Sequence, residues 1–147
     1  MCKIFIHADP ELYRSRSRSL RLHGVATSIR LENLFWQVLT EIGQRDGMSA
    51  AQLITCLFDE LHATGGDCAN FSSFLRVCCG RYLALQIAGR IPVDTNVAIR
   101  SLDADWVLEG ERLSRARRRL LEPLADHPDH ADQPNRADRS NLVASAR

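Results

Sequence analysis

The hydrophobic period of the chain changes abruptly between residues 19 and 42. From Ser19 to Leu31 apolar and polar residues alternate on either side of the dipeptide His23-Gly24, which is typical of short strands with one buried face. The next stretch, ENLFWQVLTEIGQRDG, instead has its apolar residues at helical spacing. These residues are Leu34, Phe35, Val38, Leu39 and Ile42. We therefore expect one or two strands that lead directly into an amphipathic helix, which ends near Gly47.

Two further helices are predicted downstream of this unit. Ser49 is a favourable N-cap, and Gln52 three residues later completes a capping-box pattern. The helix that follows ends at Gly65 and Gly66. A third helix is expected from Asn70 to about residue 88, and apolar residues cover much of its circumference. Such a helix has to pack against a large surface.

The remaining segments divide the chain into three parts. Residues 1–88 form the folded domain, residues 89–124 a weakly structured extension that can hold a helix, and residues 125–147 a disordered tail of polar composition. At the N-terminus, the run from Ile4 to Ile6 suits a short edge strand. Residues 14–18 are expected to be a mobile basic arm, and residues 19–31 ordered strands.

Composition excludes several classes of protein. The net charge is +1 and no stretch of 18 apolar residues occurs, so we expect no membrane span and a cytoplasmic protein. Five cysteines without a Cys-x-x-Cys pair favour buried thiols over a disulfide framework. No nucleophile arrangement and no glycine-rich phosphate loop is present, so we expect neither an enzyme nor a cofactor or metal.

A strand without a neighbour leaves its main-chain groups unpaired, so it needs a partner. The simplest partner is the same strand of a second copy, antiparallel across a two-fold axis. The polar face of that ribbon would carry Ala26, Ser28 and Arg30. Two strands fit the major groove of DNA, where arginine and serine can bond base edges. Free N–H groups at the start of the second helix, at Ser49, Ala50 and Ala51, suit a phosphate.

The stretch TSIRLENLFWQVLTEIGQRDGMSAAQLITCLFDEL, residues 27–61, resembles a ribbon-helix-helix domain of the Arc and MetJ repressor class. The longer span of residues 1–85 resembles a bacterial subfamily of small uncharacterised proteins with an extra N-terminal segment and a third helix. The resemblance implies a mainly α fold with a short β-ribbon, dimeric, with the third helix on the core, and the composition adds a disordered C-terminal tail. It places base reading on Ala26, Ser28 and Arg30, and the phosphate clamp on Ser49 and Ala50.

Two functions remain open at this point. The first is a homodimeric, sequence-specific binder of double-stranded DNA, reading the major groove as a transcriptional regulator. Its auxiliary basic residues would be Arg14, Arg16, Arg18 and Arg21. The second is an interaction scaffold, similar to an antitoxin, in which the third helix and the segment from Ile91 to Leu124 bind a partner protein. The basic ribbon favours the first function, and the unusually apolar third helix favours the second.

Overall fold

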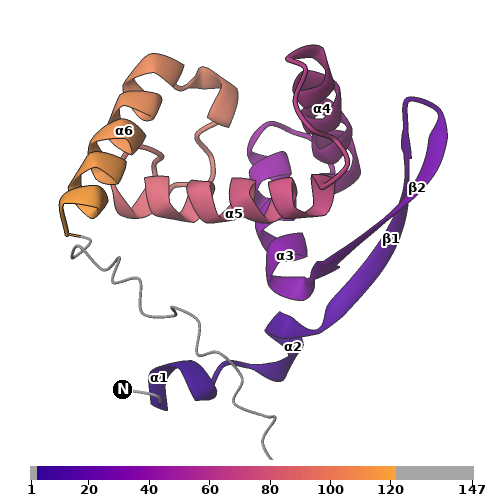
Figure 1. The fold of residues 1–147 in the computed structure, drawn as a ribbon, viewed down its shortest axis with the longest axis horizontal. Helices are drawn as coiled ribbons and strands as arrows, with labels where there is room; N and C mark the ends of the chain where they lie inside the picture. The colour runs from indigo at the N-terminus through magenta and orange to yellow at the C-terminus, as the bar shows by residue number, and fades with distance from the viewer. Residues whose placement is uncertain (1–2, 122–147) are drawn as a thin grey trace, which may run out of the picture.

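The computed structural model describes residues 3–121 (Figure 1). The predicted tail at residues 125–147 and the end of the extension lie outside the described residues. The elements are α1 (Lys3–Ile6), α2 (Pro10–Tyr13), β1 (Ser15–Leu22), β2 (Val25–Glu32), α3 (Asn33–Arg45), α4 (Ala50–Ala63), α5 (Phe71–Ile87), a 3₁₀ turn (Ile99–Ser101) and α6 (Ala104–Leu121). The protein is therefore mainly helical with one two-stranded antiparallel sheet among the described residues.

The sheet is a β-hairpin that runs along one side of the helices (Figure 1). Its turn consists of His23 and Gly24, both with positive φ, at 48° and 80°. Positive φ at both positions is the condition for a two-residue turn whose twist matches that of the strands. Residues 15–18 lie inside β1, so the prediction of a mobile basic arm is wrong for them. The N-terminal strand lies beside β2 and does not cover it.

The hairpin has one face toward the helices and one toward solvent. Leu22, Ile29 and Leu31 are buried in the core, and Leu20 packs against it. In a two-residue hairpin the residues directly opposite each other share a face. The register pairs Leu20 with Thr27 and Leu22 with Val25, so the even-numbered residues of β1 and the odd-numbered residues of β2 face the helices.

The first two helices follow the sequence closely. Helix α3 spans the predicted segment, and Gly47 after it has φ of 72°. Helix α4 begins with the predicted capping box, in which the Ser49 hydroxyl accepts from Gln52 N and the Gln52 side chain accepts from Ser49 N. One residue of the predicted apolar face is misplaced. Leu34 is exposed, whereas Trp36, which is not among the predicted apolar-face residues, is buried under the hairpin.

Trp36 is held in place by β1. Its indole Nε1 donates to the carbonyl of Arg16 at 3.0 Å, and the Arg18 guanidinium lies 4.5 Å from the ring centroid. A buried indole needs a partner for its N–H, and a strand carbonyl supplies it here. The pairing of β1 with β2 brings that carbonyl within reach.

Helix α5 is the predicted third helix, and it crosses the core. Phe71, Leu75, Cys79, Tyr82 and Leu85 are buried along it. The run from Ile4 to Ile6, expected as an edge strand, forms the exposed helical turn α1. Among the described residues, no helix is both long and apolar enough to span a membrane.

The segment after α5 is fastened to the core by Arg45, which is buried at 6% exposure. Its guanidinium donates to the carbonyls of Pro92, Asp94 and Val97 and to the Tyr82 hydroxyl, at 2.9 to 3.0 Å. The Tyr82 hydroxyl in turn donates to the Glu41 carboxylate. One arginine at the end of α3 thereby orders a loop some fifty residues further along the chain.

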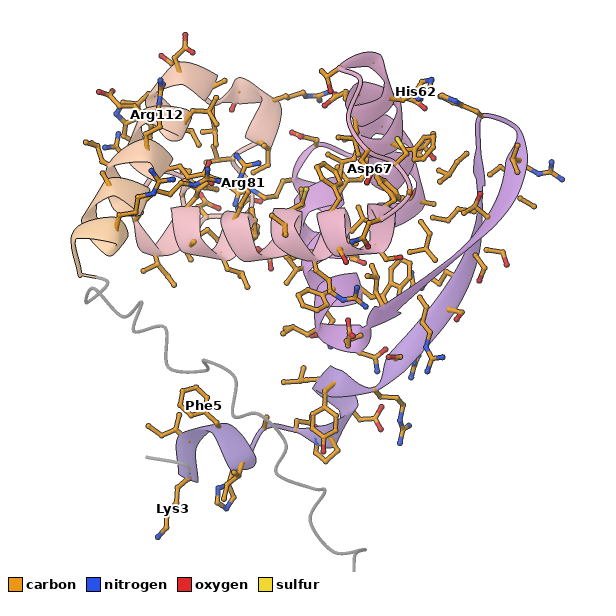
Figure 2. All side chains as sticks on the ribbon, viewed as in Figure 1. Lys3, Phe5, His62, Asp67, Arg81 and Arg112 are labelled. Carbon is orange, nitrogen blue, oxygen red and sulfur yellow. The ribbon has the colours of Figure 1, made fainter. Side chains whose placement is uncertain are left out.

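An ion pair joins helix α6 to α5. Arg81 donates from Nε and Nη2 to the two carboxylate oxygens of Glu111, at 2.9 and 2.7 Å, and Figure 2 shows Arg81 between the two helices. Ile91 and Val107 are buried in the same core. The described part of the extension is thus folded onto the domain.

Candidate nucleic-acid interface

The solvent face of β2 carries the three predicted base-reading residues. Ala26, Ser28 and Arg30 are all exposed, because the strand alternation turns them away from the buried Ile29 and Leu31. Among the described residues, no carboxylate lies within ion-pair distance of Arg30. A guanidinium without a competing carboxylate is free to bond a base or a phosphate.

The solvent face extends across β1, which sequence reasoning did not foresee. The register places Ser17 opposite Arg30, Ser19 opposite Ser28, and Arg21 opposite Ala26. All of these residues are exposed. A signal was available in the sequence, because a two-residue turn at His23-Gly24 fixes every cross-strand pair. We call the surface made by these six residues the hairpin face.

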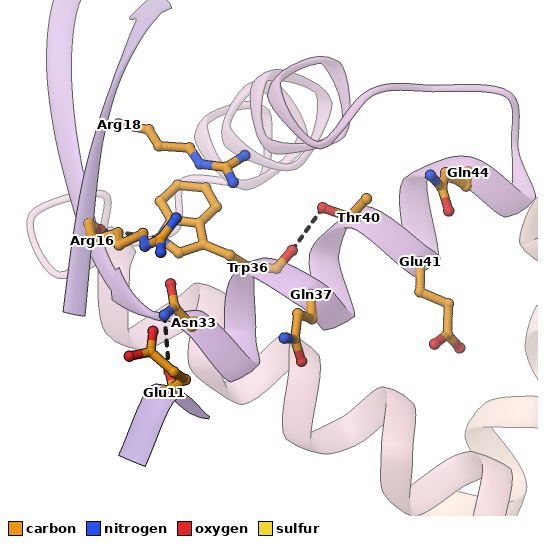
Figure 3. A pocket seen from close by; sticks show the side chains of 9 residues that line it. All are labelled: Glu11, Arg16, Arg18, Asn33, Trp36, Gln37, Thr40, Glu41 and Gln44. Carbon is orange, nitrogen blue, oxygen red and sulfur yellow. Dashed lines mark hydrogen bonds between the residues drawn. The ribbon is translucent and has the colours of Figure 1, made fainter. Parts of the chain in front are cut away.

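Two of the four auxiliary arginines point away from the hairpin face. Arg16 and Arg18 line a pocket of about 520 Å³ on the helix side, against Trp36 (Figure 3). The same pocket is lined by Glu11 and Glu41. A third auxiliary residue, Arg14, pairs with Glu11 at 2.8 Å just before β1. Of the four predicted auxiliary residues, Arg21 is the one on the hairpin face.

One acidic residue, Glu32, lies at the end of the hairpin face, and its charge is paired with an arginine. The Glu32 carboxylate accepts from Arg76 of α5 at 2.9 and 3.2 Å. These hydrogen bonds hold the pKa of the Glu32 carboxyl below its usual value. Arg76 thus offsets a charge that would otherwise repel a polyanion at this end of β2.

The start of α4 offers less than the sequence suggested. The Ser49 N–H, predicted to be free, already donates to the Gln52 side chain at 2.9 Å. Ala50 is 7% exposed, whereas Ala51 is exposed. A phosphate at this helix end would therefore compete with Gln52 for Ser49.

Both outer edges of the hairpin carry unpaired main-chain groups. The residues flanking a two-residue turn form a hydrogen-bonded pair, and such pairs then alternate along the strands. The Asn33 N–H donates to the Arg14 carbonyl at 2.9 Å, which continues the alternation. The N–H and C=O groups of Ala26, Ser28 and Arg30 therefore point away from β1, and no described backbone group bonds them.

Comparison with known proteins bears on this arrangement directly. The model of a family described as "Ribbon-helix-helix domain" matches residues 15–83, from the first residue of β1 into α5. Among solved structures, an uncharacterized protein from Bordetella pertussis Tohama I is similar. It is 63% identical in sequence, with a TM-score of 0.72, over 75% of this chain and 88% of that chain. No curated protein matches the chain.

The family match and the strand–helix–helix order agree with each other. Strand β2 leads without a break into α3, and a Gly-x-Ser turn leads into α4. Proteins built this way are typically non-enzymatic DNA-binding proteins. The chain belongs to the ribbon-helix-helix family.

Proposed function

We propose that this protein is a homodimeric, sequence-specific binder of double-stranded DNA that acts as a transcriptional regulator in the bacterial cytoplasm. The observation that carries the proposal is the hairpin face. An exposed arginine and serine lie on a strand whose main-chain edge is also unpaired among the described residues. One strand can therefore join a second copy and still present Ser28 and Arg30 to a ligand.

The dimer follows from the outer edge of β2. An unpaired edge is a template for another strand, and a two-fold axis makes the new pair antiparallel. With the axis at Ser28, each Ala26 lies opposite the partner's Arg30. The main-chain N–H and C=O groups of these residues point outward, so in this register each residue can form hydrogen bonds with the residue opposite it in the other copy. The result is a ribbon of two β2 strands with its side chains on one exposed face.

The ribbon has the chemistry of a major-groove reader. The groove is about 12 Å wide and admits two strands. Arg30 can donate to the O6 and N7 of guanine together, and the Ser28 hydroxyl can donate or accept. Ala26 offers a methyl group, which suits contact with thymine. In this assignment Arg30 is the principal determinant of sequence preference, and Ser28 the second.

Contacts to phosphate would fix the position of the ribbon. The N-terminus of α4 contributes the positive end of a 14-residue helix. We propose that a phosphate accepts hydrogen bonds from the Ala50 and Ala51 N–H groups and from the Ser49 hydroxyl. The Ser49 hydroxyl then gives up its bond to the Gln52 side chain. Such contacts add affinity without adding sequence preference.

The experiment is selection of genomic DNA fragments at physiological salt by the wild type and by Ser28→Ala/Arg30→Ala. Arg16→Ala, which removes an equal charge from the opposite face, is the control. We expect the wild type and the control to recover one roughly palindromic motif, and the double variant to recover none while staying folded. An unchanged motif in the double variant would remove base reading from β2, and no enrichment by any of the three proteins would remove the proposal.

The scaffold function has one observation in its favour. On α5, Val77 and Ile87 are 57% and 89% exposed, so both aliphatic side chains are available to a partner. Since Ile91 and Val107 are buried, a partner would dock on a folded surface and not on an unstructured tail. A Val77→Asp/Ile87→Asp variant tests it. Loss of a stoichiometric co-purifying protein, with DNA selection unchanged, would support the scaffold.

A further inference from the structure

We infer that β1 contacts the DNA backbone on both sides of the groove, through Arg21, Ser17 and Ser19. The inference rests on the proposed function, because it assigns a place to a strand that lies beside the ribbon. It separates the basic residues of β1 into two groups. Arg21 faces the nucleic acid, and Arg16 and Arg18 do not.

The pairing register sets the layout of the hairpin face. When β2 pairs with its copy, the sheet has four strands, with β1 of each protomer outermost. The middle row then contains Ser19 and Ser28 twice each. On either side of this middle row, a flanking row crosses the four strands. It contains Ser17 and Arg30 of one protomer, followed by the partner's Ala26 and the partner's Arg21. Every flanking row thus has one arginine near the centre and one at the outer edge.

The dimensions place the outer strands over the phosphates. Three gaps of about 4.8 Å separate the outer strands by about 14 Å. The major groove is about 12 Å wide, so a sheet of this width cannot enter it completely. The two β2 strands lie in the groove, and each β1 lies about 7 Å from the two-fold axis, where the groove wall begins. The side chains that β1 directs toward the DNA meet the sugar-phosphate backbone at that wall.

The residue types on β1 suit a phosphate and not a base code. Serine hydroxyls donate to phosphate oxygens, and their short side chains let the strand approach closely. Arg21 supplies the charge. Its Nη1 lies 3.4 Å from the Gly24 carbonyl, which is a weak contact, and no described carboxylate lies within ion-pair distance. Its guanidinium can therefore turn to a phosphate at little cost.

The opposite face of β1 provides a control within the same strand. Arg16 is exposed and has the same charge as Arg21, but it lies on the helix side near Trp36 (Figure 3). Removing either arginine changes the net charge of the dimer equally. A difference between the two variants therefore reports contact and not overall charge.

The experiment measures the affinity of the full chain for its selected DNA site as a function of salt, for the wild type, Arg21→Ala and Arg16→Ala. Each phosphate contact contributes about 0.9 to the slope of log K against log salt, so losing one per protomer lowers the slope by about 1.8. The ratio of wild-type to Arg21→Ala affinity should then shrink about sevenfold between roughly 0.1 M and 0.3 M salt. Arg16→Ala should keep the wild-type slope. Thermal unfolding of each variant verifies its fold.

A neutral variant, Ser17→Ala/Ser19→Ala, tests the hydroxyls separately. We expect a few-fold weaker binding, an unchanged salt slope and an unchanged recognised sequence. Equal slopes for Arg21→Ala and Arg16→Ala would overturn the inference while leaving the proposed function intact. So would a change of the recognised sequence in Arg21→Ala, because that result would put β1 in the centre of the groove. Failure of the wild type to bind DNA would instead refute the proposed function.

Discussion

Replacing Arg45 by methionine should release the C-terminal extension from the domain. Methionine keeps most of the length of the side chain and removes its charge. The substitution deletes four hydrogen bonds, three of them to the carbonyls of Pro92, Asp94 and Val97. These bonds are the described hydrogen bonds of Arg45, so the loop then depends on the neighbouring apolar contacts and on the bond from Arg100 N–H to the Asp46 carboxylate.

The magnitude follows from burial. Leaving an acceptor without its donor costs about 1 to 3 kcal/mol, so the three carbonyls that Arg45 serves correspond to about 3 to 9 kcal/mol. The Asp94 side of the loop is exposed, so water can bond part of what is left unpaired, which favours the lower end. We expect Arg45→Met to lose about 3 kcal/mol of unfolding free energy. The control is Arg100→Ala, whose guanidinium is exposed and only 4.0 Å from Asp46. A surface pair of that kind contributes less than about 1 kcal/mol.

Urea denaturation combined with amide hydrogen exchange measures both the size and the place of the effect. We expect amides of α6 to lose protection first, and those of β2 and α4 to stay protected. A loss below about 1 kcal/mol would refute the assigned role of Arg45. An equal loss of protection in α4 and α6 would show that Arg45 supports the whole domain and not the extension.

Three further predictions concern single sites. Glu32 has a lowered pKa in the folded state because Arg76 donates to it. The contribution of the Glu32 carboxylate to stability is therefore present above its usual pKa of 4.5 and is lost as the pH falls through the lowered pKa. The urea midpoint of Glu32→Gln should therefore drop less than that of the wild type between about pH 6 and pH 3. Burial raises the pKa of Cys79 to about 12, so a thiol reagent at about pH 8 should label the exposed Cys56 and leave Cys79 unmodified in mass spectra of tryptic peptides. Gly24→Ala, at φ of 80°, should cost about 1 to 2 kcal/mol in thermal unfolding, and no loss would mean that the turn rearranges.

The helices were predictable because their signals are local. The spacing of Val38, Leu39 and Ile42 is visible within one segment, and the Ser49 and Gln52 capping box needs only a single helical turn of sequence. The burial of some single residues depends on packing between elements, which the hydrophobic period does not report. Trp36 could be placed only once β1 offered a carbonyl for its N–H.

Only the second half of strand β1 was predicted as a strand. Its segment SRSRSLRL has arginines at two of the four positions that face the helices, so the usual alternation of apolar and polar residues is missing from its first half. Long arginine side chains can lie along an apolar surface with the charge in water, as Arg18 does over Trp36. The pattern therefore indicated a mobile arm where the protein has a strand.

The candidate site was predicted on β2, and of the β1 residues on the hairpin face only Arg21 was predicted. Ala26, Ser28 and Arg30 face solvent as expected, and their role in base reading stays a prediction. Arg45 left no local signal at all, since its partners lie 37 to 52 residues further along the chain. Contacts across such distances depend on the path of the whole backbone.

Cross-linking of introduced cysteines tests most directly which edge of the hairpin joins two copies, on which the whole account depends. Ser28→Cys and Ser19→Cys are compared with the parent protein, using a reagent that spans less than about 8 Å. If β2 pairs with its copy, opposing Ser28 positions have Cβ atoms about 5 Å apart, whereas Ser19 positions are about 14 Å apart. We predict covalent dimer from Ser28→Cys and none above the parent from Ser19→Cys. The reverse result would place β1 at the two-fold axis and contradict the assignment of Ser28 and Arg30 as the central readers.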